Sequence, residues 1–240
     1  MIDQSDSQVN PRAIAASSHA QVHVTAHGTG RVIATFAWQH LKAATIFRDH
    51  VLHLESSHAG QPFGTFFEEL RSYASGCIMS STASLEALIN ELFIAHNSRL
   101  REKIVDFEDV FWKPHTGIEC KPILKKYQMA LDMLEVPRLD VHSQSYSDAS
   151  NLIELRNALV HYKPTWDPDR RRTVELVELL GGRFAQSPFP DAGADFVSMK
   201  CMSAGCAKWA VESTLAFMRT FDERTKLDAG KMVGFWMLET

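Results

Sequence analysis

One long apolar pattern, residues 66–93, decides the fold class of this sequence: FFEELRSYASGCIMSSTASLEALINELF. Its apolar residues recur at steps of three and four, which is the period of an amphipathic helix. Residues 85–93 are especially rich in strong helix formers. Residues 80–84 carry only small side chains, which either let another helix approach closely or mark a kink. The pattern therefore predicts one long helix.

The same helical period recurs along much of the chain. A first helix begins at Arg31 and breaks in the segment 56–62. Further helices are expected at residues 118–134 (with Pro122 near the first turn), 147–162, 170–180 (stopped by Gly181 and Gly182) and 204–224. Residues 196–199 are expected to form a short strand. Because a βαβ alternation is missing, the predicted fold is all-α, an up-and-down bundle of about five to seven helices with short irregular or strand-like extensions.

The domain prediction places a tail at residues 1–30, a helical domain at 31–224 and a C-terminal extension at 225–240. The tail holds one weakly alternating stretch, which suggests a short strand. His19, His23 and His27 are spaced four apart, as metal ligands on one helix face would be. Strand-favouring neighbours and the glycines that follow make a solvated tail the preferred interpretation.

Composition excludes several classes of protein. The chain has 240 residues, 45% of them hydrophobic and 22% charged, which is unlike a disordered chain. The net charge of −4 argues against a protein that coats nucleic acid by bulk charge, although it permits a small basic site. The sequence has no uninterrupted run of about 18 apolar residues, so no membrane span is predicted. The N-terminus lacks a secretory pattern, and the four scattered cysteines favour the reducing cytoplasm.

Common catalytic and cofactor motifs are also missing. The sequence has no phosphate-binding glycine loop, no dinucleotide-binding glycine motif, no His-Glu-x-x-His and no Gly-x-Ser-x-Gly. No cofactor and no metal are therefore expected. Cys201 and Cys206 lack a second pair of ligands, so we interpret them as buried structural thiols.

Residues 151–164, NLIELRNALVHYKP, carry the most distinctive polar pattern. On a helix of about 100° per residue, one side collects the apolar residues Leu152, Leu155, Leu159 and Tyr162. The other side collects Glu154, Asn157 and His161. Arg156 falls inside the apolar arc, which is unusual for a charged side chain.

This helix is expected to end near His161, because Pro164 disfavours helical geometry at the preceding residue. The negative end of the helix dipole favours a protonated imidazole there, which suits a general acid or base. Two structural interpretations stay open. Arg156 can extend along apolar surface with its guanidinium in water, and His161 can cap the terminal carbonyl groups.

The run Arg-Asn-Ala-Leu-Val-His, residues 156–161, resembles the Arg-x4–6-His signature of the HEPN superfamily (higher eukaryotes and prokaryotes nucleotide-binding). Residues 84–92 resemble, more weakly, a second-helix segment of HEPN-like proteins. Many members are metal-independent endoribonucleases of toxin–antitoxin modules, defence systems and RNA processing. The resemblance implies a helical bundle, a motif that faces a dimer cleft, and hence a homodimer. It also implies single-stranded RNA as substrate and an antitoxin protein as a partner.

The chemistry of RNA cleavage without a metal suits these residues. It needs a base for the 2′-hydroxyl, an acid for the leaving oxygen and a cation for the phosphate. His161 would supply acid–base catalysis, Arg156 would bind the phosphate, and Asn157 would orient the imidazole or bind the scissile phosphate. Arg156 and His161 point about 140° apart on an ideal helix, so a second copy is one way to bring them together.

Two basic clusters are candidates for RNA contacts. One comprises Arg170, Arg171 and Arg172, and the other comprises Lys121, Lys125 and Lys126. Each is equally compatible with an ordinary solvated face.

Other interpretations of the same helix remain. The spacing from Arg156 to Tyr162 also resembles HEPN partners of nucleotidyltransferases, in which a tyrosine accepts the nucleotide. The apolar side on which Tyr162 falls favours a packed core tyrosine over such a modification site. The main rival to the nuclease is a catalytically silent HEPN-like module that binds a nucleotide or forms a dimer. A third interpretation is an unrelated helical protein whose six-residue match arose by chance.

Overall fold

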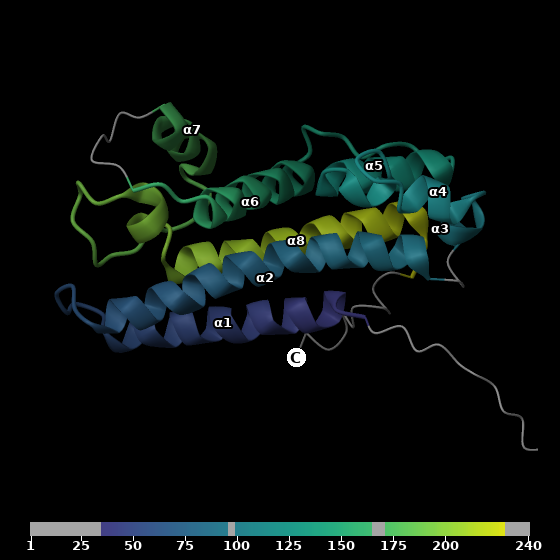
Figure 1. The fold of residues 1–240 in the computed structure, drawn as a ribbon. Helices are drawn as coiled ribbons and strands as arrows, with labels where there is room; N and C mark the ends of the chain where they lie inside the picture. Colours follow the sequence, from purple (N-terminus) through teal and green to yellow (C-terminus); the bar gives the residue numbers. More distant parts are fainter. Residues whose placement is uncertain (1–34, 96–98, 165–170, 229–240) are drawn as a thin grey trace, which may run out of the picture. The chain divides into compact units, whose positions relative to one another are not determined.

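The computed structural model describes residues 35–95, 99–164 and 171–228, and all regular elements in these ranges are helical (Figure 1). They are α1 (Ala37–Ser57), α2 (Phe66–Ile94), α3 (Arg99–Glu102), α4 (Phe107–Phe111), the 3-10 turn η1 (Ile118–Cys120), α5 (Ile123–Met133), α6 (Gln144–Val160), α7 (Arg171–Leu180), the π-helical turn η2 (Phe196–Lys200) and α8 (Ala204–Thr225). The predicted all-α class is confirmed. The tail predicted at residues 1–30, with its strand and histidines, lies outside the described residues.

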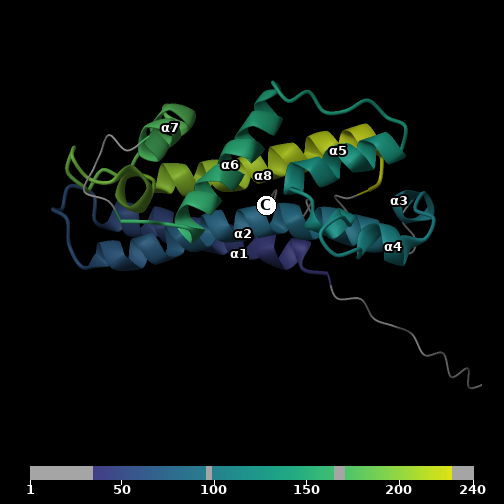
Figure 2. The ribbon, with the colours of Figure 1, turned by 45° about the horizontal axis from the view of Figure 1, so that its top comes forward.

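Helix α2 is the central element of the bundle. It lies beside α1 and α8 in both views, and it also contacts α5 and α6 (Figures 1 and 2). The small residues in its middle permit this packing. The Ser84 hydroxyl donates to the carbonyl of Ala37 in α1 at 3.0 Å, and the Thr214 hydroxyl of α8 lies 3.5 Å from the carbonyl of Ser81. Of the two interpretations of this segment, the structure supports close helix approach.

Among the described helices, α2 alone is long and apolar enough to cross a membrane by length and composition. However, 56% of its most apolar window is buried against the rest of the bundle. An apolar helix at the centre of a core has the same composition, because it is covered on most of its circumference.

The core has two regions along α2. The first joins the C-terminal half of α2 to α5 and to the C-terminal half of α8, where the rings of Phe217 and Phe221 meet Tyr127 edge to face. The second joins the N-terminal half of α2 to α6, α7, η2 and the start of α8. The apolar residues Leu152, Leu155 and Leu159 of the motif segment belong to the second region.

Two carboxylates fix the ends of helices across the bundle. Glu91 of α2 accepts hydrogen bonds from the backbone N–H groups of Phe36 and Ala37 at the start of α1. Glu55 of α1 accepts the N–H of Ala204 at the start of α8, at 2.8 Å. The first N–H groups of a helix lack intrahelical partners and carry partial positive charge, so both contacts are favourable.

The segment after α7 is fastened to α6. Helix α7 ends at Leu180 as predicted, since Gly182 adopts φ = +74°, a conformation that glycine tolerates best. Arg183 then forms an ion pair with Asp148 of α6 and donates to the Ser147 hydroxyl at 3.2 Å. These contacts position α7 against the N-terminal half of α6.

Four local predictions of secondary structure are wrong. The first helix, expected from Arg31, begins at Ala37, and Phe36 is its N-cap. The helix expected from residue 118 begins at Ile123, because residues 118–120 form a 3-10 turn and Pro122 occupies the N-cap. The strand expected at residues 196–199 is the π-helical turn η2, in which the Asp195 carboxylate accepts the Ser198 N–H at 2.6 Å. The short helices α3 and α4 lie where none was predicted, because four or five residues are too few for a periodic signal.

Candidate functional site

Helix α6 carries the motif and is anchored at both ends. The Ser143 hydroxyl caps its N-terminus by accepting the Tyr146 N–H, so the helix starts three residues earlier than expected. Leu152 and Leu155 are fully buried against the rest of the second core region. The helix ends at Val160, close to the position that Pro164 predicted.

Arg156 lies half-buried on the flank of this apolar face. Its Nε–H is enclosed by protein and has no hydrogen-bond partner among the described residues. An enclosed donor without an acceptor costs free energy relative to a paired one, and each such group requires an explanation. The terminal nitrogens of the guanidinium extend beyond this enclosed atom, on a side chain that is half-buried.

His161 is the C-cap residue of α6 and is exposed. Its backbone N–H donates to the carbonyl of Asn157 at 3.0 Å, and no hydrogen bond of its imidazole ring occurs within the described residues. The ring therefore lies at the surface of the described part of the chain. Asn157, one turn earlier, is half-buried.

No hydrogen bond or ion pair joins Arg156 to His161 within the described residues. On a regular helix, side chains five positions apart point about 140° apart, although His161 is the C-cap and lies just beyond the last helical residue. Their surroundings differ accordingly, since the arginine is half-buried and the histidine is exposed.

The exposure of Tyr162 differs from the one that the sequence predicts. It was expected to be a packed core residue, but 40% of its surface is exposed. Its phenol lies 3.2 Å from the Ser198 hydroxyl of η2. Helix α6 has ended at Val160, so helical periodicity no longer fixes the direction of this side chain.

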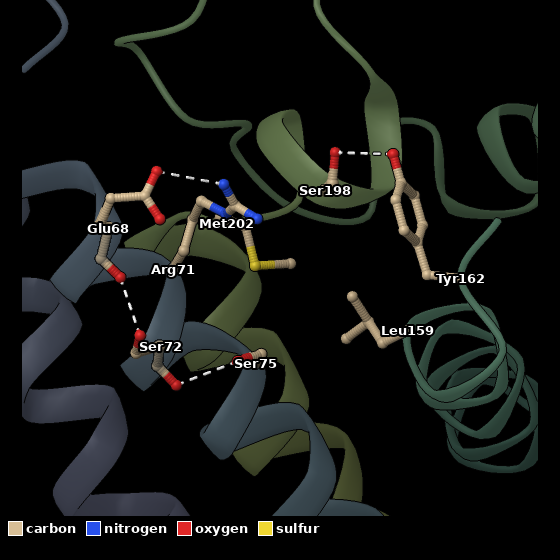
Figure 3. A pocket seen from close by; sticks show the side chains of 8 residues that line it. All are labelled: Glu68, Arg71, Ser72, Ser75, Leu159, Tyr162, Ser198 and Met202. Carbon is tan, nitrogen blue, oxygen red and sulfur yellow. Dashed lines mark hydrogen bonds and ion pairs between the residues drawn. The ribbon is translucent and has the colours of Figure 1, made fainter. Parts of the chain in front are cut away.

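Tyr162 lines a pocket of about 230 Å³ at this end of the bundle (Figure 3). We call it the α2–α6 pocket. Its walls are Glu68, Arg71, Ser72 and Ser75 of α2, Leu159 and Tyr162 at the end of α6, Ser198 of η2, and Met202. Apart from Leu159 and Tyr162, sequence reasoning missed these residues. They come from segments far apart in the chain, and no local motif connects them.

The two basic clusters differ in the exposure of their described side chains. Arg171 is exposed and forms an ion pair with Glu175 at 2.7 Å, whereas Arg170 and the side chain of Arg172 lie outside the described residues. Lys125 is exposed, as expected of a solvated face. Lys126 is not, because its side chain is only 1% exposed and lies in the core. A lysine in that position cannot contact RNA.

Cys201 and Cys206 are buried, as expected. Cys77 is also buried, and burial raises the pKa of Cys77 to about 12. The pKa values of Cys201 and Cys206 are raised for the same reason. Within the described residues, no three His, Cys, Asp or Glu side chains are grouped so that they could hold a metal ion.

Comparison with known proteins returns no match to any family model, to any curated protein or to any solved structure.

Proposed function

We propose that the chain is a HEPN-like, metal-independent endoribonuclease that cleaves single-stranded RNA as a homodimer. One observation carries the proposal. The end of α6 holds a half-buried arginine, Arg156, whose enclosed Nε has no partner among the described residues, and five positions later an exposed imidazole, on His161. These are the two groups that metal-free cleavage of RNA requires, at the spacing of the HEPN signature.

In the proposed reaction, the neutral His161 imidazole of one copy removes the proton of the RNA 2′-hydroxyl. The 2′-oxygen bonds to phosphorus as the bond from phosphorus to the 5′-oxygen breaks. The partner's His161, in its protonated form, gives a proton to the departing 5′-oxygen. Arg156 binds the non-bridging phosphate oxygens, on which negative charge accumulates. The products are a 2′,3′-cyclic phosphate and a 5′-hydroxyl.

The proposed dimer is one way to bring the two side chains together. Two copies related by a two-fold axis would place the Arg156 side of one α6 beside the His161 end of the other. Two apolar side chains at this end, Val160 at 46% exposed and Tyr162 at 40%, would lose contact with water in such an interface.

The test uses purified full-length protein and end-labelled single-stranded RNA in the presence of EDTA. We expect cleavage that leaves a cyclic phosphate, and its loss by at least about a hundredfold in His161→Ala. The matched control is His53→Ala, which removes an exposed histidine of α1. RNA with a 2′-deoxy residue at the cleaved position should stay intact. Equal activity of the wild-type protein and His161→Ala refutes the assignment.

The second candidate is a catalytically silent HEPN-like dimer module. The observation that favours it is that neither Arg156 nor His161 lines the α2–α6 pocket. In this case Arg156 would pair across the dimer interface, and Arg156→Ala would be monomeric by light scattering while RNA stays uncut. An Arg156→Ala variant that remains dimeric counts against it. A cytoplasmic location and a toxin or defence role belong to the nuclease proposal.

A further inference from the structure

The α2–α6 pocket lies next to the proposed catalytic histidine. Tyr162, which lines it, directly follows His161, and consecutive Cα atoms are about 3.8 Å apart. Pockets that hold drug-sized ligands start at about 300 Å³, so a pocket of about 230 Å³ suits a smaller, flat group. Figure 3 shows Leu159 and Tyr162 on one side of the space, and Arg71, Ser72 and Ser75 on the other.

Each hydroxyl group around the pocket donates its hydrogen to another protein group. Ser72 donates to the carbonyl of Glu68 at 2.8 Å, and Ser75 donates to the carbonyl of Ser72 at 3.0 Å. Ser198 donates to the Asp195 carboxylate at 2.7 Å, so Tyr162 must donate to Ser198. Each hydroxyl therefore presents oxygen lone pairs to the pocket, and its walls mostly accept hydrogen bonds.

Two charged side chains of α2 complete the polar wall. Glu68 adds carboxylate oxygens and is 73% exposed on its side chain. Arg71 is 38% exposed, contacts Glu68 at 3.4 Å, and supplies the donors that the hydroxyls lack. One turn of helix thus presents an acceptor beside a donor, three residues apart.

This arrangement disfavours a phosphate. Among the described residues that line the pocket, Arg71 is the one cation, and it is paired with Glu68. A second carboxylate, that of Asp195, accepts the hydroxyl hydrogen of Ser198. A bound phosphate would face oxygen lone pairs on most sides. A group with two N–H donors next to a carbonyl acceptor fits better. The Watson–Crick edge of guanine carries N1–H and N2–H beside O6, and its major-groove edge offers O6 and N7 to an arginine.

We infer that the α2–α6 pocket is a subsite for a guanine base of the RNA, read by Glu68 and Arg71 and stacked against Tyr162. Glu68 accepts N1–H and N2–H, Arg71 donates to O6, and Leu159 and Met202 provide apolar contact for the ring. The inference rests on the proposed ribonuclease function, because it places that base beside the cleaved phosphate. The enzyme would then cut next to guanosine.

The binding test uses full-length protein, isothermal titration calorimetry and four probes: GMP, AMP, CMP and UMP. GMP should bind about five- to a hundredfold more tightly than the others, which is the discrimination one bidentate contact provides. Glu68→Gln should remove this preference. Glu69→Gln, which changes an exposed neighbour on α2 that does not line the pocket, should retain it. Equal affinity for the four nucleotides, equal effects of the two variants, or displacement of GMP by inorganic phosphate overturns the inference.

A cleavage assay separates this inference from the proposed function. If GMP binding depends on Glu68 but no RNA is cut, the subsite stands and the nuclease proposal fails. If cutting depends on His161 but ignores guanine, and GMP does not bind, the nuclease stands and the subsite is overturned. If both hold, Glu68→Gln should alter the position of cutting, whereas His161→Ala should stop cutting and leave GMP binding intact.

Discussion

The ammonium group of Lys126 donates a hydrogen bond of 3.0 Å to the side-chain oxygen of Asn90, joining α5 to α2 inside the core. The Lys126 side chain is 1% exposed, and its second contact, Glu86 at 3.5 Å, is 44% exposed. Burial removes the ammonium group from water, and its contacts with Asn90 and Glu86 offset only part of that desolvation free energy.

We therefore expect Lys126→Met to change the free energy of unfolding by no more than about 1 kcal/mol in either direction, since methionine fills a similar volume without a charge. Lys126→Ala should cost about 2–4 kcal/mol, because it leaves a cavity in addition to the unpaired Asn90 oxygen that both variants leave. Urea unfolding measures both. The control Lys125→Met, at an exposed neighbour, should stay within about 0.5 kcal/mol. Equal losses in the methionine and alanine variants would contradict this account.

Tyr127 offers a test of the core beside it. Its hydroxyl donates to the Leu85 carbonyl at 2.8 Å, and the residue is fully buried. Tyr127→Phe keeps the ring contacts with Phe217 and Phe221 but removes this hydrogen bond, leaving the Leu85 carbonyl with its helical partner inside α2 alone. We expect a loss of about 1–2 kcal/mol in thermal or urea unfolding. Tyr146→Phe is the control, because Tyr146 is only half-buried and no hydrogen bond of its hydroxyl occurs within the described residues.

The burial of Cys77, Cys201 and Cys206 predicts how many thiols of the native protein react with a thiol reagent. Burial raises the pKa of Cys77 to about 12, and it also raises the pKa values of Cys201 and Cys206, so very little thiolate forms at these positions near pH 8. Cys120 is exposed. Native protein should therefore react with one equivalent of a thiol reagent per chain, and the Cys120→Ser variant with none on the same timescale. Denaturant should release the rest. Two or more fast thiols in the native wild-type protein would show that the core opens readily.

Glu55 predicts a pH dependence of stability. Burial raises the pKa of this carboxyl above its usual value, and the hydrogen bond from Ala204 opposes the shift only partly. The folded protein therefore binds a proton more tightly than the unfolded chain does. The contribution of Glu55 to stability is fully present below the unfolded pKa of about 4.5 and is lost as pH rises through the folded pKa.

Glu55→Gln removes this titration while keeping an oxygen that accepts the Ala204 N–H. The difference in unfolding free energy, wild type minus Glu55→Gln, should become more favourable to the wild type as pH falls from 7 to about 5. Glu55→Ala also removes the acceptor and should be about 1 kcal/mol less stable than Glu55→Gln at pH 7. A difference that is flat with pH, or that changes in the opposite direction, would contradict the assignment.

Much of the fold was predictable because its signals are local. The apolar period of α2 fixed its extent almost to the residue, since a helix that is covered on most sides must be apolar on most sides. Pro164 and the Gly181–Gly182 pair placed the ends of α6 and α7 through backbone restrictions that act within a turn. The strand predicted at residues 196–199 is wrong. Their composition favours a strand, but the Asp195 carboxylate accepts hydrogen bonds from Ser198 and stabilises a turn instead.

Some features of the candidate site are determined by the sequence alone, and others only by the tertiary structure. The spacing of Arg156, Asn157 and His161 along one helix is a property of the sequence alone, because helical geometry converts spacing into angle. The burial of Lys126, the exposure of Tyr162 and the pocket between Arg71 and Tyr162 were decided only by the tertiary structure. Each depends on which segments, distant in the chain, come to lie together. That outcome is set by the packing of the whole core, and no local pattern of residues encodes it.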